Sequence, residues 1–226
     1  MENEFKQIAS LIGDPTRATI LWTLLDGRAF TATELAIAAD TSLQNISMHL
    51  AKLSRADLLH VEHQGRHRYY KFSRKDIAYA IEALANLVSP AIQTSKIEKE
   101  QNSALKYCRT CYDHLAGKVG VSITDSLLKQ KLIVQKRSTF QLSGKGEKWF
   151  SDFGIDLKDL KKQKRTFIRP CLDWTERTYH LAGSLGASLL DVMLASDWIR
   201  RTKNSRAIVI TFRGQSKLYD HFKITV

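Results

Sequence analysis

The spacing of apolar residues predicts a series of short amphipathic helices at the start of the chain. Residues 5–13, 14–27 and Thr31–Ala39 each place apolar side chains three or four positions apart, which is the repeat of a helix that buries one face. Thr31 and Glu34 have the spacing of a capping box, so they predict the N-terminus of the third helix. A tight turn at residues 40–41 then leads into a fourth helix.

This fourth helix, expected within Ser42–Leu59, has a polar face that the core does not need. Ser42 is a candidate N-cap, and Ile46, Leu50 and Leu53 recur at helical spacing, so they predict one buried stripe. The opposite face carries Gln44, Asn45, Ser47, His49 and Lys52. These side chains can hydrogen-bond to base edges and phosphates, and the segment has no acidic residue before Asp57 that would repel a polyanion.

A basic hairpin is expected directly after this helix. Leu59–Val61 and Arg68–Phe72 predict two short strands around Gln64-Gly65-Arg66. A polar helix followed by a basic hairpin is typical of a winged helix-turn-helix, in which the helix enters the major groove and the wing contacts the adjacent backbone. The expected DNA-binding residues are Ser42, Gln44, Asn45, Ser47, His49, Lys52, Arg66, His67 and Arg68.

The pattern also predicts how the chain is divided. A further helix over Asp76–Val88 carries an apolar stripe wide enough to pair with another helix (Ile77, Ala80, Ile81, Leu84, Leu87 and Val88), and Ser89-Pro90 ends it. We expect a DNA-binding and dimerisation domain over residues 1–92, a polar linker over 93–103, and a second domain over 104–226 in which an effector could be sensed.

Several segments of the first domain resemble one bacterial family. They are Asp14-Pro15-Thr16-Arg17, Glu34-Leu35-Ala36, Ser47-Met48-His49-Leu50 with Leu53 and Leu58, and Gly65-Arg66-His67-Arg68-Tyr69-Tyr70. In order and spacing they resemble the ArsR/SmtB family of winged-helix transcriptional regulators. The resemblance implies a homodimer joined through its first and fifth helices, bound to an imperfect palindrome in double-stranded DNA. It further implies repression until an inducer, often a metal ion, arrives.

The chain departs from that family at its metal-binding positions. Metal-sensing members carry a cysteine pair on the third helix, where this chain has Glu34-Leu35-Ala36-Ile37-Ala38. The predicted helix Asp76–Val88 has no histidine. Neither metal site of the family can therefore be transferred to these residues.

The second half contains an internal repetition. His114-Leu115-Ala116-Gly117 recurs as His180-Leu181-Ala182-Gly183, and at the same offset Gly120, Ser122, Asp125, Leu128 and Ile133 match Gly186, Ser188, Asp191, Leu194 and Ile199. Each copy predicts a helix, a second helix, a short basic hairpin (Ile133–Leu142; Ile199–Ile210) and a closing helix. The expected fold is mainly α with small β hairpins (α+β), with an N-terminal winged helix-turn-helix and two winged-helix-like pseudo-repeats.

Charge and composition extend this interpretation. The net charge of +12 favours a polyanionic partner, although solubility alone would also account for it. Ten Lys/Arg balance ten Asp/Glu in residues 1–95, so the excess lies in the second half, which leaves a nonspecific architectural DNA binder as an alternative. The polar start and the lack of an apolar run near ~20 residues predict a cytoplasmic protein.

The three cysteines all lie in the second half. Cys108, Cys111 and His114 are spaced by three, which on a helix would align them along one flank. Thiolates with imidazoles are ligands that zinc or cadmium selects, and the quartet Cys111, His114, Cys171 and His180 would join the two copies. A purely structural role, a redox or electrophile sensor and a small organic effector remain alternatives.

Two further interpretations concern acidic residues. Residues 171–177 place an acid, a tryptophan and an arginine side by side, which indicates either a small-molecule pocket or a buried Trp with an ion pair. Asp113, His114, Asp173 and Glu176 would be the acids and bases of an enzyme. The sequence has no phosphate-binding glycine loop, nucleophile elbow or zinc-hydrolase helix, so we expect a regulator and no enzyme.

Overall fold

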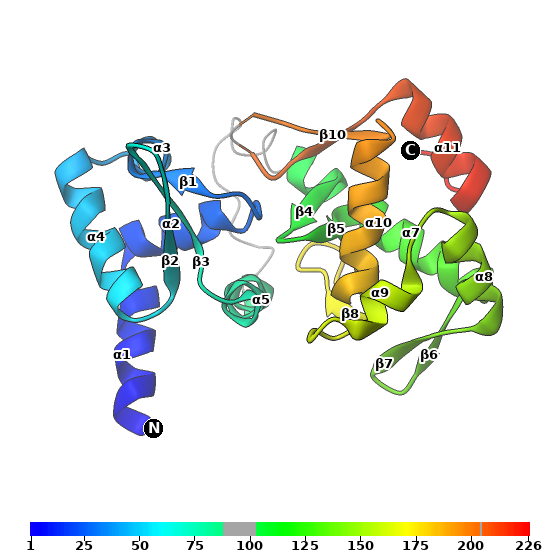
Figure 1. The fold of residues 1–226 in the computed structure, drawn as a ribbon, viewed down its shortest axis with the longest axis horizontal. Coiled ribbons are helices and arrows are strands. Elements are labelled where there is room, and N and C mark those ends of the chain that lie inside the picture. The colour runs from blue at the N-terminus through cyan, green and yellow to red at the C-terminus, as the bar shows by residue number, and fades with distance from the viewer. Residues whose placement is uncertain (88–102, 204) are drawn as a thin grey trace. The chain divides into compact units, whose positions relative to one another are not determined.

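The computed structural model describes residues 1–87, 103–203 and 205–226 (Figure 1). The chain divides into two compact units, residues 1–85 and 86–226. The expected end of a helix at Ser89-Pro90 and nearly all of the expected linker lie outside the described residues. Within the described ranges, no helix has the length and apolar character needed to cross a membrane.

The first unit contains the predicted helices. They are α1 (Glu2–Ile12), α2 (Pro15–Leu24), α3 (Ala32–Ala38), α4 (Leu43–Arg55) and α5 (Lys75–Leu84), with a 3₁₀ turn η1 (Ala85–Leu87) after α5. Asp14 caps α2 by accepting a hydrogen bond from the backbone of Arg17, and Thr31 and Glu34 form the predicted capping box of α3. Ile46, Leu50 and Leu53 are fully buried, as the stripe on α4 predicted.

A three-stranded sheet completes this unit and contains the predicted wing. Its order is β1 (Phe30–Thr31), β3 (His67–Phe72) and β2 (Leu59–Gln64). Leu59 pairs with Phe72 and Gln64 with His67, so both wing strands are longer than expected and Gly65-Arg66 alone forms the turn. The sequence pattern missed β1 because two residues are too few to show an alternation.

The fifth helix differs from its prediction. Its α-helical part begins at Lys75 and ends at Leu84, and Val88 lies outside the described residues. Ile77 and Ile81 are buried as expected, whereas Leu84 and Leu87 are exposed. The predicted apolar stripe is therefore divided. Ile77 and Ile81 pack in the core of this unit, and Leu84 and Leu87 do not.

The second unit is an α+β region of helices and small hairpins. After a helical turn at 103–107 come β4 (Arg109–Cys111), β5 (His114–Ala116), α7 (Gly117–Lys129), β6 (Ile133–Lys136), β7 (Thr139–Leu142), α8 (Gly144–Asp152), α9 (Leu157–Lys162), β8 (Arg169–Leu172), β9 (Tyr179–Ala182), α10 (Gly183–Ala195), β10 (Ile199–Arg201), β11 (Ile208–Ile210) and α11 (Phe212–Phe222). Hairpins β6–β7 and β10–β11 have the predicted end pairs, Ile133 with Leu142 and Ile199 with Ile210.

The helix expected around Cys108–His114 was wrong, because this stretch is the hairpin β4–β5. Cys111 and His114 lie opposite each other on its two strands, so they are cross-strand neighbours and do not share a helix flank. The turn between them uses Tyr112 at φ +57°, a left-handed conformation that a sequence reader expects of Gly or Asn. The later repeat of the pattern also begins with a hairpin, β8–β9.

Close backbone packing joins the central helices of this unit to its hairpins. One hydrophobic core includes Val119 and Ile123 of α7 together with Leu185 and Leu189 of α10. A Cβ on Gly120 would lie 2.6 Å from the carbonyl oxygen of Leu115, too close for a real contact. Gly120 and its counterpart Gly186 thus allow α7 and α10 to lie directly against the chain that carries the histidines.

We expect Gly120→Ala to destabilise the protein, because its methyl group would collide with backbone that cannot move aside. The free energy of unfolding should fall by ~1–3 kcal/mol, as for other overpacked cores. Gly144→Ala is the matched control, because a Cβ there would meet nothing within 4 Å. Chemical denaturation of the full-length variants checks this, and equal stability of Gly120→Ala and the wild type would contradict the packing argument.

Candidate metal centre and nucleic-acid interface

Helix α4 presents a polar face with two apolar additions. Gln44, Ser47 and Lys52 are exposed, and Ser42 serves as the N-cap by accepting a hydrogen bond from the backbone of Asn45. The Asn45 amide is half-buried and donates to Thr41 Oγ1 at 2.8 Å. The helix also exposes Leu43 and Met48, which the sequence interpretation did not include, although apolar side chains can contact thymine methyl groups.

His49 is oriented differently from the other polar residues of α4. Its Nδ1 lies 3.4 Å from Asp14 Oδ1 and 3.5 Å from Arg17 Nη1, at the start of α2. Backbone hydrogen bonding from Arg17 lowers the pKa of Asp14, which stays ionised beside the imidazole. His49 therefore links α4 to the start of α2.

The tip of the wing is basic and open to solvent. Arg66, His67 and Arg68 are all exposed, and Arg66 Nε lies 3.5 Å from His67 Nε2. Further along the same hairpin an ion pair links Lys71 of β3 to Glu62 of β2. The wing therefore offers two arginines for a phosphate backbone while a neighbouring lysine is already paired.

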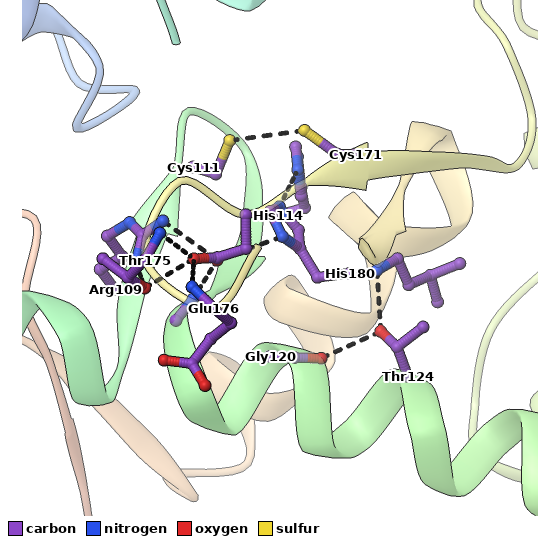
Figure 2. A network of polar contacts seen from close by, with 12 residues as sticks. Arg109, Cys111, His114, Gly120, Thr124, Cys171, Thr175, Glu176 and His180 are labelled. Atoms are coloured by element: carbon purple, nitrogen blue, oxygen red, sulfur yellow. Dashed lines mark hydrogen bonds and ion pairs between the residues drawn. The ribbon is translucent and has the colours of Figure 1, made fainter. Parts of the chain in front are cut away.

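The second unit brings four candidate ligands together. Cys111 and His114 face each other across hairpin β4–β5, and Cys171 and His180 face each other across β8–β9. Their ligand atoms all lie within 4.8 Å of one another. Three of the side chains are buried and Cys171 is half-buried, while the third cysteine, Cys108, is buried outside this group. Figure 2 shows the two thiols pointing toward each other from separate hairpins.

The distances inside this group suit a tetrahedral ion. Cys111 Sγ lies 3.9 Å from Cys171 Sγ, and His114 Nε2 lies 3.1 Å from His180 Nε2. Around a tetrahedral zinc ion with ~2.3 Å bonds to sulfur and ~2.0–2.1 Å bonds to nitrogen, two sulfurs would be ~3.8 Å apart and two nitrogens ~3.3 Å apart. The two sulfurs and the two nitrogens are thus each already near the separation that such an ion requires.

A carboxylate lies behind each imidazole. Asp113 Oδ1 is 3.2 Å from His114 Nδ1, and Asp173 Oδ2 is 3.3 Å from His180 Nδ1. A carboxylate at Nδ1 favours the tautomer that has its proton there, so Nε2 presents a lone pair. Two such lone pairs 3.1 Å apart repel each other unless a proton or a metal ion lies between them.

The two carboxylates are themselves held by arginines. Arg165 Nη1 donates to Asp113 Oδ2 at 2.8 Å, and Arg109 Nη2 donates to Asp173 Oδ2 at 3.0 Å. Burial alone would raise the pKa of both carboxyl groups. The histidine and arginine neighbours outweigh burial, so both pKa values lie well below the usual range and both groups stay ionised.

Residues 171–177 form a buried ion pair with a tryptophan. Asp173 Oδ2 also accepts a hydrogen bond from the backbone of Gly117 at 2.7 Å. The fully buried guanidinium of Arg109 lies over the Trp174 ring, with its Cζ 4.6 Å from the ring centroid. The arginine of this ion pair is Arg109, which lies sixty-four residues before Asp173 in the chain. Residues 171–177 alone therefore cannot indicate this partner. Of the two interpretations of this string, the structure favours the buried ion pair.

The pKa values of Cys108 and Cys171 are shifted in opposite directions by their surroundings. Burial raises the pKa of Cys108 to about 12, so this thiol stays protonated. The hydrogen bond from Cys111, with help from His114 and His180, holds the pKa of Cys171 far below its ordinary value despite burial. Burial alone would lower the pKa of His180, but Asp173 and Cys171 reverse this and raise it. Cys171 and His180 therefore each favour the charged form of the other.

A sequence signal for the carboxylates existed but was missed. Residues 109–113 read Arg-Thr-Cys-Tyr-Asp and residues 169–173 read Arg-Pro-Cys-Leu-Asp, at an offset of 60. The histidines that follow are offset by 66, because the second turn is six residues longer. An alignment of the two segments at the offset of 66 matches the two histidines. It does not match the arginine, cysteine and aspartate that recur before them at the offset of 60.

Comparison with known proteins identifies the family. A helix-turn-helix domain family matches residues 12–62. The HTH-type transcriptional regulator YdfF of Bacillus subtilis (strain 168) is 41% identical over 226 residues, which is 100% of both chains.

Among solved structures, similarity is limited to part of the chain. HlyU from Vibrio cholerae is 26% identical over 38% of this chain and 92% of its own, with a TM-score of 0.36. The cadmium metal-sensor CMTR from Mycobacterium tuberculosis is 27% identical over 40% of this chain and 91% of its own, with a TM-score of 0.31. With its full-length relative, its helix-turn-helix match and its wing, this chain belongs to the ArsR family of winged helix-turn-helix transcriptional regulators and carries a C-terminal extension.

Proposed function

We propose that this regulator is a dimeric repressor that a thiophilic divalent metal ion, such as zinc or cadmium, releases from its operator. The observation that carries the proposal is the group Cys111, His114, Cys171 and His180, whose donor atoms lie within 4.8 Å of one another, with the S–S and N–N pairs near tetrahedral separations. Two thiolates and two imidazoles form a donor set typical of zinc. When bound, the ion would supply a fixed link between two hairpins that no hydrogen-bonded strand ladder connects.

The carboxylates support a binding role over a purely structural one. Metal-ligating histidines commonly donate their other ring nitrogen to a carboxylate, which orients the ring and raises its basicity. Here Asp113 is hydrogen-bonded to His114 Nδ1, and an Asp173 oxygen lies 3.3 Å from His180 Nδ1. A core without a ligand would not need a buried charge at Asp173 and a half-buried one at Asp113 behind two buried rings, since a charge is costly to bury.

The repetition in sequence supports a second part of the proposal. We infer that the second unit arose as two winged-helix-like pseudo-repeats, because the order strand, strand, helix, strand, strand, helix occurs twice in it. Each copy contributes one cysteine, one histidine and one aspartate to the centre. Gly186 lies next to the His114 side chain and Gly120 next to that of His180, so each central helix packs against the other copy's ligand. An ion at this centre would fix the angle between the copies.

The first unit supplies the proposed DNA-binding and dimerisation surfaces. We propose that Ser42, Gln44, Asn45, Ser47 and Lys52 of α4 contact the major groove and that Arg66, His67 and Arg68 contact the backbone, with His49 positioning the helix. None of the residues of α1 is buried, and Phe5 is 72% exposed and Leu87 80% exposed. Such apolar surface on the first helix and after the fifth favours a homodimer joined there.

We expect Gln44→Ala to reduce discrimination between the operator and random DNA by ~1–3 kcal/mol, since a planar amide can read an adenine edge. Arg68→Ala should instead weaken binding to all sequences alike and lower its salt dependence. Titration of the operator and of a scrambled duplex at several salt concentrations separates the two effects. A variant at Gln44 with unchanged preference would show that this residue does not read bases, and a footprint spread over random DNA would favour an architectural binder.

Zinc should lower the operator affinity of the wild type, and Cys111→Ser should abolish this response. The reason is that the variant keeps three donors and loses one of two thiolates. Cys108→Ser is the matched control, because Cys108 is a buried thiol outside the centre. Cobalt absorption bands report tetrahedral thiolate coordination independently of DNA binding. If metal-free protein bound neither zinc nor cadmium at micromolar concentrations, the metal-responsive function would be refuted.

The zinc affinity should weaken as the pH falls, because protons compete for the same nitrogen and sulfur atoms. The raised pKa of His180 places the onset of this competition above the usual histidine value of about 6.5. Isothermal titration between pH 8 and pH 5.5 in buffers of different ionisation enthalpy would report both the affinity and the protons released. A pH-independent affinity would exclude His180 as a ligand.

A further inference from the structure

The two cysteines of the centre differ in their access to solvent. Cys171 is half-buried, whereas Cys111 and Cys108 are fully buried. Cys171 Sγ lies 3.9 Å from Cys111 Sγ, as the dashed line in Figure 2 marks. A small oxidant from solvent would therefore meet Cys171 first, with a second thiol directly behind it.

We propose that Cys111 and Cys171 form an oxidation site, at which a hydroperoxide attacks Cys171 and Cys111 then closes a disulfide. Cys171 is the reacting thiol because it is the accessible one, and Cys111 is the resolving thiol because it is the near one. Cys108 is buried apart from this pair and takes no part.

The chemistry balances with hydrogen peroxide as the oxidant. The Cys171 sulfur attacks one peroxide oxygen, the O–O bond breaks, and a sulfenic acid and one water molecule form. The Cys111 sulfur then attacks the sulfenic sulfur, the S–O bond breaks, and a second water molecule leaves. In total the two thiols lose two electrons and two protons. The peroxide accepts these electrons and protons and becomes two water molecules.

The two sulfurs start close together. A disulfide has an S–S bond of ~2.05 Å, so from 3.9 Å the two sulfurs must approach by ~1.9 Å. Strands β4 and β8 belong to separate two-stranded sheets, so no shared ladder of hydrogen bonds fixes the spacing between the two hairpins. The bond would close a loop between residues 111 and 171 and tie one hairpin to the other.

The effect on metal binding rests on the function proposed above. A disulfide uses both sulfur ligands and leaves only the imidazoles of His114 and His180, so an ion held by all four donors would be released. A bound ion would in turn shield the Cys171 sulfur from peroxide. Oxidation and metal binding would therefore exclude each other at one centre.

The test uses metal-free, reduced full-length protein treated with hydrogen peroxide and digested without reductant. Mass spectrometry should find a peptide pair joined through Cys111 and Cys171, and Cys108→Ser should give the same pair. In Cys111→Ser, the sulfenic acid at Cys171 should accumulate and be trapped by a cyclic 1,3-diketone. The absence of the linked pair in the wild type, or faster labelling of Cys108 than of Cys171, would overturn the proposal.

A second arm separates this inference from the proposed function. Zinc-loaded protein should release one ion for each disulfide formed, measured with a chromogenic zinc indicator. Disulfide formation in a protein that binds no zinc when reduced would support the oxidation site and refute the metal-responsive function. Tight zinc binding without any disulfide after removal of the metal would refute the oxidation site alone.

Discussion

The C-terminal unit depends on the pairing of two buried imidazoles with two carboxylates, of which Asp173 is buried and Asp113 half-buried. A charged group inside a protein needs a partner, and each carboxylate here has an arginine as well as a histidine. The arginines and carboxylates orient the rings of His114 and His180, so that the Nε2 atoms of the two rings face each other. The chemistry of the centre is therefore set by residues that would not touch a bound ion.

Close packing brings these charges together. The hairpins that carry the ligands are only three or four residues per strand, too short to be stable without support. Helices α7 and α10 provide that support, and the hydroxyl of Thr124 on α7 accepts a hydrogen bond from the backbone of Leu181 on β9 (Figure 2). Gly120 on α7 and Gly186 on α10 let these helices approach the strands that carry His180 and His114. Packing and ligand geometry are thus one constraint.

Much of the first unit could be predicted from sequence because its signals are local. The capping box of α3, the proline at the start of α2 and the glycine turn of the wing each occupy a few consecutive residues. The same reasoning selected the four residues that the structure brings together, through the chemistry of thiols and imidazoles.

The remaining features depend on contacts that a sequence pattern does not show. Tyr112 adopts a left-handed turn conformation although it is not a glycine. The sequence pattern around Cys108–His114 therefore predicts a helix where the structure has a hairpin. The ion pair of Asp173 with Arg109 joins residues far apart in the chain. His49, chosen as a polar residue of α4, is turned toward Asp14 by the packing of two helices. In each case the deciding interaction is tertiary.

The two ligand hairpins have turns of unequal length, so the two sides of a nearly symmetric centre have different contacts with the rest of the unit. Only the longer turn carries Trp174 and Thr175, which together with Asp173 surround the guanidinium of Arg109. That guanidinium also donates to the carbonyl oxygen of Leu105, in the helical turn through which the described part of this unit begins. Hairpin β4–β5 is thus joined to the entry of the unit by the chain itself, whereas hairpin β8–β9 is joined to that entry through side-chain contacts with Arg109. A displacement of either hairpin would therefore reach the entry by a different route.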